Sequence, residues 1–392
     1  MRNYFPESGK EIAEYGFYYV KKLLNDVSKR IIISGGGTGG HIFPAIAIAN
    51  ALKAKDPQTE ILFVGANGRM EMEKVPQAGY PIFGLDIAGI NRSNLLANLS
   101  FPVKLTKSLW AARKVIRDFK PDAAVGVGGY ASGPLLLMAG MNGVPYLIQE
   151  QNSYAGITNK FLAQNARKIC VAYPDMQAFF PTEKVVMTGN PVRSDIGSVS
   201  ATDPNVWEYF KGLSPDVPTL LVIGGSQGAR TINESIDAGL EQLLASGYQI
   251  IWQTGKLYID KARQRVAALH SNRIWVSDFI NQMPYAYAAA SVVISRAGAL
   301  SISELCLVGK PSIFVPLPTA AEDHQTKNAL ALVREEAGLL VKDTEAREKL
   351  IPTTLELFKS KEVQHSMGQQ IRQLAKPQAA QQIAEEVWKL TQ

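Results

Sequence analysis

Residues 30–41, RIIISGGGTGGH, decide the fold, because a run of isoleucines leads there directly into a glycine-rich turn. The segment Arg30–Ser34 is short and β-branched, which is typical of a buried strand in a parallel sheet. The turn Gly35–Gly40 follows it, and Ile42–Ala54 has the composition of an apolar helix. Glycine lets a backbone approach a ligand closely, and a helix start presents free N–H groups that favour anions. We therefore predict a strand–turn–helix unit with an anion-binding turn.

A second unit of the same kind begins halfway along the chain. Thr219–Ile223 (TLLVI) predicts a strand, Gly224–Gly228 a turn, and Ala229 the start of a helix. Further strands are predicted at residues 60–65, 123–126, 145–149, 168–172, 185–188, 249–253, 273–276, 292–295 and 311–315. Strands that alternate with helices indicate parallel sheets with right-handed crossovers. Because 392 residues exceed the size at which one core stops growing, we predict an α/β protein of two Rossmann-like, doubly wound domains with a cleft between them.

The domain junction is predicted where the motif GNPVR, Gly189–Arg193, meets a polar stretch that contains prolines. The final helix, near Ala379–Leu390, could belong to either domain by its sequence, and we expect it to pack back on the first. Residues 1–29 stand outside both units and predict at most a short amphipathic helix. The expected parts are an extension at 1–29, an N-terminal domain at 30–192, a C-terminal domain at 193–377 and the returning helix at 378–392.

The composition favours a cytosolic protein with a basic surface. The formal net charge is +6, which suits an anionic membrane surface or an anionic substrate, although it can serve solubility alone. No basic stretch is interleaved with aromatic residues, which argues against nucleic acid as a partner. No apolar run reaches the roughly 18 residues of a membrane span, and the N-terminus lacks a signal-peptide pattern. Membrane contact is therefore expected to be peripheral.

His41 is the candidate catalytic residue of the first motif. The pattern G-x-G-x-x-G suggests a dinucleotide oxidoreductase, but that function needs an acid at the end of the second strand, where Gly65, Ala66 and Asn67 stand. His41 lies at a helix start, where the helix dipole disfavours imidazolium. A neutral imidazole can accept a proton from a hydroxyl group, so we predict a general base.

Polar groups also follow four other strands. Gly224–Ala229 (GGSQGA) is a second anion-binding turn, unless it serves packing alone. In Arg296–Glu304 (RAGALSISE), Glu304 could accept hydrogen bonds from both hydroxyls of a ribose, or it could be only a partner of the helix dipole. The runs Gln149–Asn152 and Ala321–Asn328 lie where an α/β sheet forms its ligand crevice.

Taken together, these motifs resemble the MurG family of UDP-GlcNAc transferases, in glycosyltransferase family 28. The resemblance runs from about Arg30 to the C-terminus and is carried by GGGTGGHIFPA, GVGGYASGP, EQNSYAGITNK, GNPVR, GGSQGAR, RAGALSISE and DHQTKNA. It implies a GT-B fold and a hexosyltransferase that works with inversion. The implied reaction moves GlcNAc from UDP-GlcNAc to the C4 hydroxyl of MurNAc in lipid I (undecaprenyl-diphosphate-MurNAc-pentapeptide). The implied products are lipid II and UDP, for peptidoglycan synthesis at the cytoplasmic face of the cell membrane.

The resemblance also implies which residues bind the sugar nucleotide. It assigns Asn152 and Gln325 to GlcNAc, Arg193 and Ser226 to the diphosphate, and the backbone of Ile280 to uracil. The full set implied for UDP-GlcNAc is Thr38, Gly39, Gly40, Asn152, Arg193, Ser226, Ile280, Ala299, Leu300, Ser301, Ile302, Ser303, Glu304 and Gln325. Two departures lie beside these residues: Gln149 stands where many members carry histidine, and His324 where some carry glutamine.

The sequence contains no D-x-D pair of the kind that holds a divalent ion on a sugar diphosphate. We therefore predict no essential metal and no cofactor, with the charge of the leaving group met by backbone N–H groups and basic side chains.

Apolar residues are accompanied by basic residues between positions 90 and 117. This predicts a patch for anionic phospholipid or, alternatively, core packing beside a solvated face. The patch consists of Leu95, Leu96, Leu99, Phe101, Lys104, Lys107 and Trp110.

Other functions remain open on the residues alone. A diacylglycerol glycosyltransferase or a UDP-GlcNAc epimerase would share the GT-B fold, and a non-catalytic sugar-nucleotide sensor would share the binding motifs.

Overall fold

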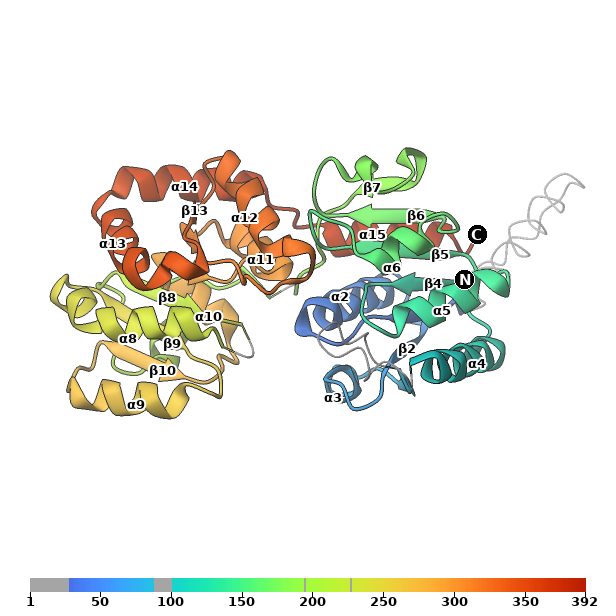
Figure 1. The fold of residues 1–392 in the computed structure, drawn as a ribbon, viewed down its shortest axis with the longest axis horizontal. Helices are drawn as coiled ribbons and strands as arrows, with labels where there is room; N and C mark the ends of the chain where they lie inside the picture. Colours follow the sequence, from blue (N-terminus) through green and yellow to red (C-terminus); the bar gives the residue numbers. More distant parts are fainter. Residues whose placement is uncertain (1–27, 88–100, 194, 226–227) are drawn as a thin grey trace, which may run out of the picture.

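The two isoleucine- and leucine-rich runs form the central strands of two separate sheets. A computed structural model describes residues 28–87, 101–193, 195–225 and 228–392, and it places the two sheets side by side (Figure 1). All strand pairs within the described residues are parallel. The predicted α/β fold class is therefore confirmed.

The first sheet has seven strands among the described residues, in the order β3-β2-β1-β4-β5-β6-β7. Ile33 of β1 lies in register between Phe63 of β2 and Val125 of β4, and all three side chains are fully buried. The strands are β1 (Arg30–Ser34), β2 (Glu60–Ala66), β3 (Ile82–Leu85), β4 (Ala123–Gly126), β5 (Tyr146–Glu150), β6 (Lys168–Val171) and β7 (Val185–Met187).

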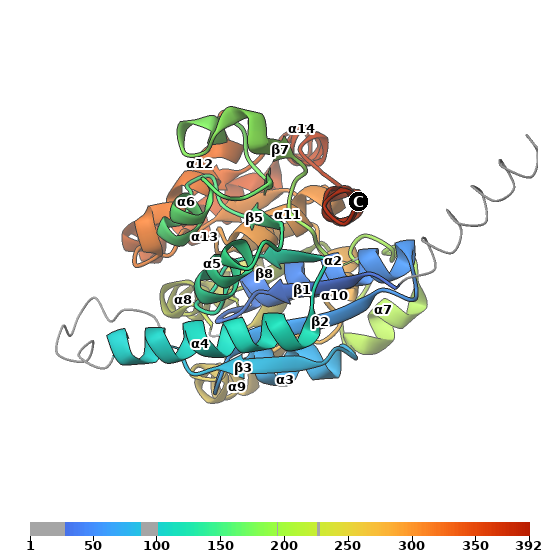
Figure 2. The ribbon, with the colours of Figure 1, turned by 90° about the vertical axis from the view of Figure 1, so that its right-hand side faces the viewer.

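Helices cover both faces of this sheet. One face packs against α2 and the other against α4 and α5, so that each face has its own apolar core (Figure 2). The helices are α2 (Gly39–Lys55), α3 (Glu71–Gln77), α4 (Phe101–Phe119), α5 (Ser132–Met141) and α6 (Ile157–Leu162), with 3₁₀ turns at Met176–Ala178 and Thr182–Lys184.

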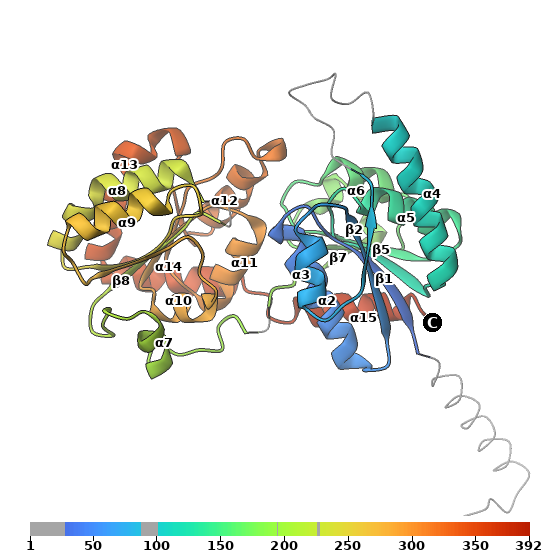
Figure 3. The same cartoon turned by 90° about the horizontal axis from the view of Figure 1, so that it is seen from below.

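The second sheet repeats this plan with six described strands in the order β10-β9-β8-β11-β12-β13. Helices lie on both sides of this sheet (Figure 3). Its strands are β8 (Thr219–Ile223), β9 (Gln249–Gln253), β10 (Ile274–Ser277), β11 (Val292–Ser295), β12 (Ser312–Phe314) and β13 (Leu339–Leu340). Its helices are α7 (Pro204–Tyr209), α8 (Arg230–Ala245), α9 (Ile259–Ala268), α10 (Met283–Ala289), α11 (Ala299–Val308), α12 (His324–Arg334), α13 (Ala346–Lys359) and α14 (Lys361–Gln373), with 3₁₀ turns at Ala321–Asp323 and Asp343–Glu345.

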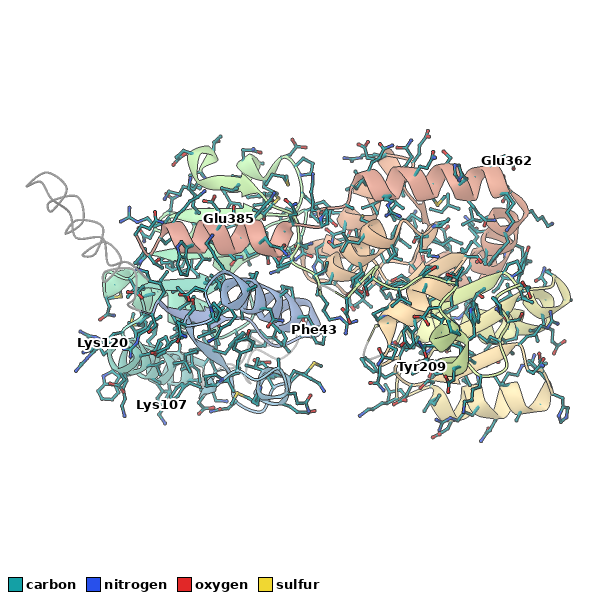
Figure 4. The ribbon with its side chains drawn as sticks, turned by 180° about the vertical axis from the view of Figure 1, so that it is seen from behind. Phe43, Lys107, Lys120, Tyr209, Glu362 and Glu385 are labelled. Atoms are coloured by element: carbon teal, nitrogen blue, oxygen red, sulfur yellow. The ribbon has the colours of Figure 1, made fainter. Side chains whose placement is uncertain are left out.

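The last helix, α15 (Ala379–Lys389), lies against the first sheet and not the second. Ile383, Ala384 and Val387 are buried in the same core as α2. Figure 4 shows Glu385 of α15 beside the N-terminal half and Glu362 of α14 at the far end of the C-terminal half. The chain therefore crosses between the halves a second time after α14.

Two expectations need correction. Helix α2 begins at Gly39, so the last two glycines of the predicted turn already belong to the helix. Strands β3 and β13 were not predicted, because both are short edge strands without a buried run of β-branched residues. No described helix is long and apolar enough to cross a membrane. Of the extension at residues 1–29, the structure describes residues 28 and 29 alone, so the short helix expected there lies outside the described residues.

Both cysteines are buried and free. Cys170 lies in β6 and Cys306 in α11. Burial raises the pKa of each thiol to about 12. Thiols with such pKa values carry almost no thiolate near neutral pH, so both act as small core residues.

Candidate active site

Both glycine-rich turns lie at points where the order of strands reverses. Gly35–Gly40 follows β1, which lies between β2 and β4, and Gly224–Gly228 follows β8, which lies between β9 and β11. In an open α/β sheet the ligand crevice forms at such points, beyond the carboxyl ends of the strands. Polar side chains from the two halves meet nearby, because Asn190 Nδ2 donates to Ser303 Oγ at 3.1 Å. The candidate site is therefore a crevice between the two sheets.

His41 lies in the first turn of α2, with its ring held by main-chain atoms. Its Nδ1 is 3.1 Å from the carbonyl oxygen of Gly36. A carbonyl only accepts hydrogen bonds, so Nδ1 carries the proton and Nε2 keeps a lone pair. A Cβ at Gly128, where φ is +100°, would lie 2.8 Å from Nε2. The glycines of GVGGYASGP therefore leave room for the ring.

The His41 ring has a lowered pKa, and the main cause is burial, which disfavours the charged form. The negative charge of Glu150 opposes this shift. The ring is thus neutral near pH 7, as expected, but burial is the main cause, where the sequence suggested the helix dipole. A neutral imidazole with a free Nε2 can accept a proton.

Glu150, at the end of β5, holds the loop that carries Asn152. It is 2% exposed and accepts hydrogen bonds from the N–H groups of Asn152 and Gly156, both at 3.1 Å, and from Asn159 Nδ2 at 2.8 Å. Asn152 Nδ2 also donates to Glu150, at 3.3 Å, and its Oδ1 accepts from Asn328 Nδ2 at 3.3 Å. The Asn152 side chain is therefore oriented by two neighbours, one of them in the C-terminal half.

Glu304 lies half-buried in α11 and forms a hydrogen bond with a buried tyrosine. Tyr287 Oη donates to Glu304 Oε2 at 2.8 Å. Burial raises the pKa of Glu304, while the Tyr287 hydrogen bond and the positive charge of Arg193 lower it. Arg193 also lies 3.5 Å from Asp195. The structure thus brings Arg193 and Glu304 together, as their assignment to one nucleotide requires.

The start of α11 supplies backbone donors. Gly298 is the N-cap of this helix, and the Ile302 N–H is the first to bond back to it, at 3.0 Å. The N–H groups of Ala299, Leu300 and Ser301 precede that bond, so they point out of the helix end and favour an anion. The Ile302 side chain is 3% exposed in a core, so only its backbone can face a ligand.

Several other residues expected to bind UDP-GlcNAc form hydrogen bonds within the protein. Ile280 N–H donates to Gln253 Oε1 at 3.3 Å, and Gln253 Nε2 donates to the Gly225 carbonyl at 3.1 Å. Gln325 Oε1 accepts from the Leu317 N–H at 2.9 Å. Thr38 is the N-cap of α2, followed by Gly39 and Gly40 in its first turn, and its Oγ1 lies 3.4 Å from His41 Nδ1. Ser226 lies outside the described residues.

Several polar residues of this crevice were not singled out from the sequence. Asn328 is fully buried in α12, and its Oδ1 accepts from the backbone and hydroxyl of Ser153 at 3.0 and 2.9 Å. Asn190 is 3% exposed and bonds Gln149 and the Gln151 carbonyl, each at 3.0 Å. Asn190 lies within GNPVR and Asn328 within DHQTKNA, and these motifs were the features of the sequence that could have indicated both residues. Among the described residues, no group of three or more His, Cys, Asp or Glu side chains could hold a metal ion.

Comparison with known proteins identifies the family. Residues 31–171 match the glycosyltransferase family 28 N-terminal domain, and residues 219–383 match the family 28 C-terminal domain. This chain belongs to glycosyltransferase family 28. It is 56% identical to a UDP-N-acetylglucosamine--N-acetylmuramyl-(pentapeptide) pyrophosphoryl-undecaprenol N-acetylglucosamine transferase of Parabacteroides distasonis, over 92% of this chain and 98% of the relative. The enzyme of the same name from Phocaeicola vulgatus is 58% identical over 92% of this chain and 96% of the relative.

Solved structures agree with membership of family 28. MurG of Acinetobacter baumannii superposes with a TM-score of 0.74 at 30% identity, covering 92% of this chain and 99% of that one. A UDP-GlcNAc 2-epimerase from Neisseria meningitidis has a TM-score of 0.67 over 92% of this chain and all of that one, but at 15% identity it shares the fold alone. The predicted GT-B fold, the MurG family and the glycosyltransferase class are confirmed.

Proposed function

We propose that this chain transfers GlcNAc from UDP-GlcNAc to the C4 hydroxyl of MurNAc in lipid I, giving lipid II and UDP. The names of relatives that are 54–58% identical over nearly the whole chain support this substrate pair. The observation that carries the chemistry is the His41 ring, whose Nδ1 proton is held by the Gly36 carbonyl so that Nε2 is left as the base.

In the proposed mechanism, His41 Nε2 takes the proton of the C4 hydroxyl as its oxygen bonds to the anomeric carbon of GlcNAc. The bond from that carbon to the UDP oxygen breaks on the opposite face, so the α-linked donor gives a β-1,4 product. The free N–H groups at the start of α11 and the Arg193 guanidinium meet the charge of departing UDP. Glu304 accepts hydrogen bonds from the ribose hydroxyls.

The experiment that tests this proposal measures lipid II formation from lipid I and UDP-GlcNAc. His41→Ala should lower kcat by roughly 100-fold or more, the typical contribution of a general base, while affinity for UDP changes little. Because burial lowers the pKa of His41, the acidic limb of the kcat/KM profile should lie below the ordinary histidine value. A sensor would make no product, and an epimerase would change the sugar nucleotide without lipid I.

Near-normal turnover in His41→Ala would remove His41 from this role. Turnover of UDP-GlcNAc without any lipid II would instead reject the proposed acceptor.

We propose peripheral contact with anionic phospholipid through α4. Trp110 is 76% exposed, and it lines a groove of about 700 Å³ together with Phe83, Lys107 and Lys114. Phe101 and Lys104 lie half-buried in the first turn of the same helix. An exposed tryptophan beside lysines suits the interface of a membrane, where the ring meets the headgroup region. Leu95, Leu96 and Leu99 of the expected patch fall outside the described residues.

We also propose that the two halves divide the work. Residues 30–192, with the returning helix at 378–392, would form the acceptor and membrane domain, because His41 and α4 both belong to it. Residues 193–377 would bind UDP-GlcNAc, because Arg193 and Glu304 belong to that part.

A further inference from the structure

One carboxyl group lies buried beneath the first glycine-rich turn, outside every motif considered so far. Glu71, the first residue of α3, is 1% exposed. Its Oε2 accepts a hydrogen bond from the Gly37 N–H at 2.8 Å, and its Oε1 accepts one from the Ala66 N–H at 3.0 Å. No lysine or arginine in the described part of the chain forms an ion pair with Glu71. Both oxygens of Glu71 therefore hold main-chain atoms.

The peptide unit between Gly36 and Gly37 joins this carboxyl group to His41. The N–H of that unit donates to Glu71, and its C=O accepts from His41 Nδ1 at 3.1 Å. The described chain contains no cis peptide bonds, and in a trans peptide the N–H and C=O point in opposite directions. Glu71, one peptide unit and the imidazole therefore form a continuous line of two hydrogen bonds.

The glycines around Glu71 leave the space that this arrangement needs. A Cβ at Gly36 would overlap the Glu71 carboxyl group, and a Cβ at Gly65 would lie 2.5 Å from its Cγ. An acid does therefore lie at the end of β2, where a dinucleotide enzyme would place one. Here it comes from α3 and faces the backbone of the turn.

We propose that Glu71 is a positioning residue, which fixes the Gly36–Gly37 peptide and thereby keeps the proton of His41 on Nδ1 and the lone pair on Nε2. This inference rests on the proposed role of His41 as the base. Hydrogen bonds in series polarise one another, so the carboxylate makes the Gly36 carbonyl a stronger acceptor. The same two hydrogen bonds stabilise the His41 ring when it gains a proton from the sugar hydroxyl.

The variant Glu71→Gln tests this, because glutamine has nearly the same shape but carries an NH2 group in place of one carboxylate oxygen, so one of the two N–H groups faces a donor instead of an acceptor. We expect kcat to fall roughly 10- to 100-fold, part of the usual effect of a general base. The affinity for UDP should stay within about twofold, since the residues assigned individually to the diphosphate and to uracil, Arg193, Ser226 and Ile280, lie in the other half.

The pH profile separates positioning from a general loss of structure. Glu71 and Glu150 raise the pKa of His41, and His324 of α12 lowers it. In Glu71→Gln one of the two raising charges is gone, so the acidic limb of kcat/KM should move to lower pH. The matched control is Glu73→Gln, two residues along the same helix, where an exposed carboxyl group pairs with Lys74. Its turnover and pH profile should equal those of the wild type.

A readout that does not depend on activity completes the test. In the wild-type chain labelled with ¹⁵N-histidine, the ring signals missing from His41→Ala belong to His41, and they should show a protonated Nδ1 and an unprotonated Nε2. A wild-type ring protonated on Nε2 would overturn the inference even if Glu71→Gln failed to fold. Unchanged turnover and pH profile in Glu71→Gln, with His41→Ala inactive, would reject Glu71 but leave the proposed function intact.

Discussion

Single residues in this crevice are oriented by partners that themselves do not face the substrate. Glu304 depends on the buried Tyr287, whose hydroxyl donates to the half-buried Glu304 side chain at 2.8 Å. A hydrogen bond to a charged group contributes about 1.5–3 kcal/mol. The hydroxyl of Tyr287 is therefore expected to matter for donor binding, although it makes no proposed contact with UDP-GlcNAc.

Tyr287→Phe should raise the KM for UDP-GlcNAc roughly tenfold and change kcat little, because the lost bond orients Glu304 in the ground state and the transition state alike. The Tyr287 hydrogen bond lowers the pKa of Glu304, so its loss raises that pKa. Binding of UDP-GlcNAc needs the ionised Glu304. On acidification, Tyr287→Phe should therefore lose affinity for UDP-GlcNAc at a higher pH than the wild type does.

Calorimetric titration of UDP-GlcNAc across pH gives this measurement. Tyr285→Phe, on the same helix, is the matched control, because Tyr285 packs its ring against Tyr209 at 5.8 Å and makes no hydrogen bond through its hydroxyl within the described chain. Equal donor affinities in the two variants would contradict the prediction.

Among the secondary-structure elements, α4 has one face in the core of the first sheet and one face that points outward. Ala112, Val115 and Ile116 pack into the core, while Lys107 and Trp110 face outward. Figure 4 shows Lys107 on the N-terminal half, far from Glu362 on α14. A lysine close to an anionic bilayer contributes about 1 kcal/mol to binding, so reversing two charges should weaken binding strongly.

The double variant Lys104→Glu with Lys107→Glu should bind vesicles that contain anionic phospholipid with an affinity that is lower by roughly 100-fold or more, as measured by co-sedimentation. Lys359→Glu with Lys361→Glu changes the net charge equally but lies on α13 and α14, in the other half. That control should sediment like the wild type. If both pairs weaken binding equally, only the net charge matters, and α4 is not the docking element.

At the scale of the whole molecule, the two halves are connected by polar contacts as well as by the chain. Asn328 from the second half bonds Ser153 and Asn152 from the first, and Asn190 bonds Ser303. Lys327 also places its ammonium 3.6 Å from the centre of the Tyr154 ring. These contacts lie at the crevice, so the relative position of the halves and the geometry of the site depend on the same side chains.

Asn328→Ala removes three of these hydrogen bonds, each with a net contribution of about 0.5–1.5 kcal/mol. We expect a wider distribution of distances between the halves, measured by single-molecule fluorescence with one dye on each half, and a lower kcat. Asn233→Ala is the control, because Asn233 is equally buried but bonds only Trp252 and the Thr254 carbonyl within its own half. It should lower stability without changing the distance distribution, and the same outcome for Asn328→Ala would show that its contacts do not couple the halves.

The local strand–turn–helix units could be predicted, because each is encoded in a contiguous pattern of residues. The runs 30–34, 123–126, 219–223, 249–253 and 292–295 are strands with the predicted bounds, since a buried parallel strand needs an unbroken apolar run. The turn after β1 was predictable from its run of glycines, and so was the place of His41 at the start of the following helix. The edge strands β3 and β13 have no such run, so pairing with a neighbouring strand alone defines them.

Which distant groups meet depends on how the helices and strands pack. No local pattern marks Glu71 or Tyr287, and the motif DHQTKNA contains Asn328 without indicating its partners. The hydrogen-bond partners of these three residues lie 34, 17 and 175 positions away. The cause of the lowered His41 pKa is burial, which a sequence does not display. Local periodicity fixes strands, turns and helices, whereas the partners of a buried polar group depend on how those elements pack.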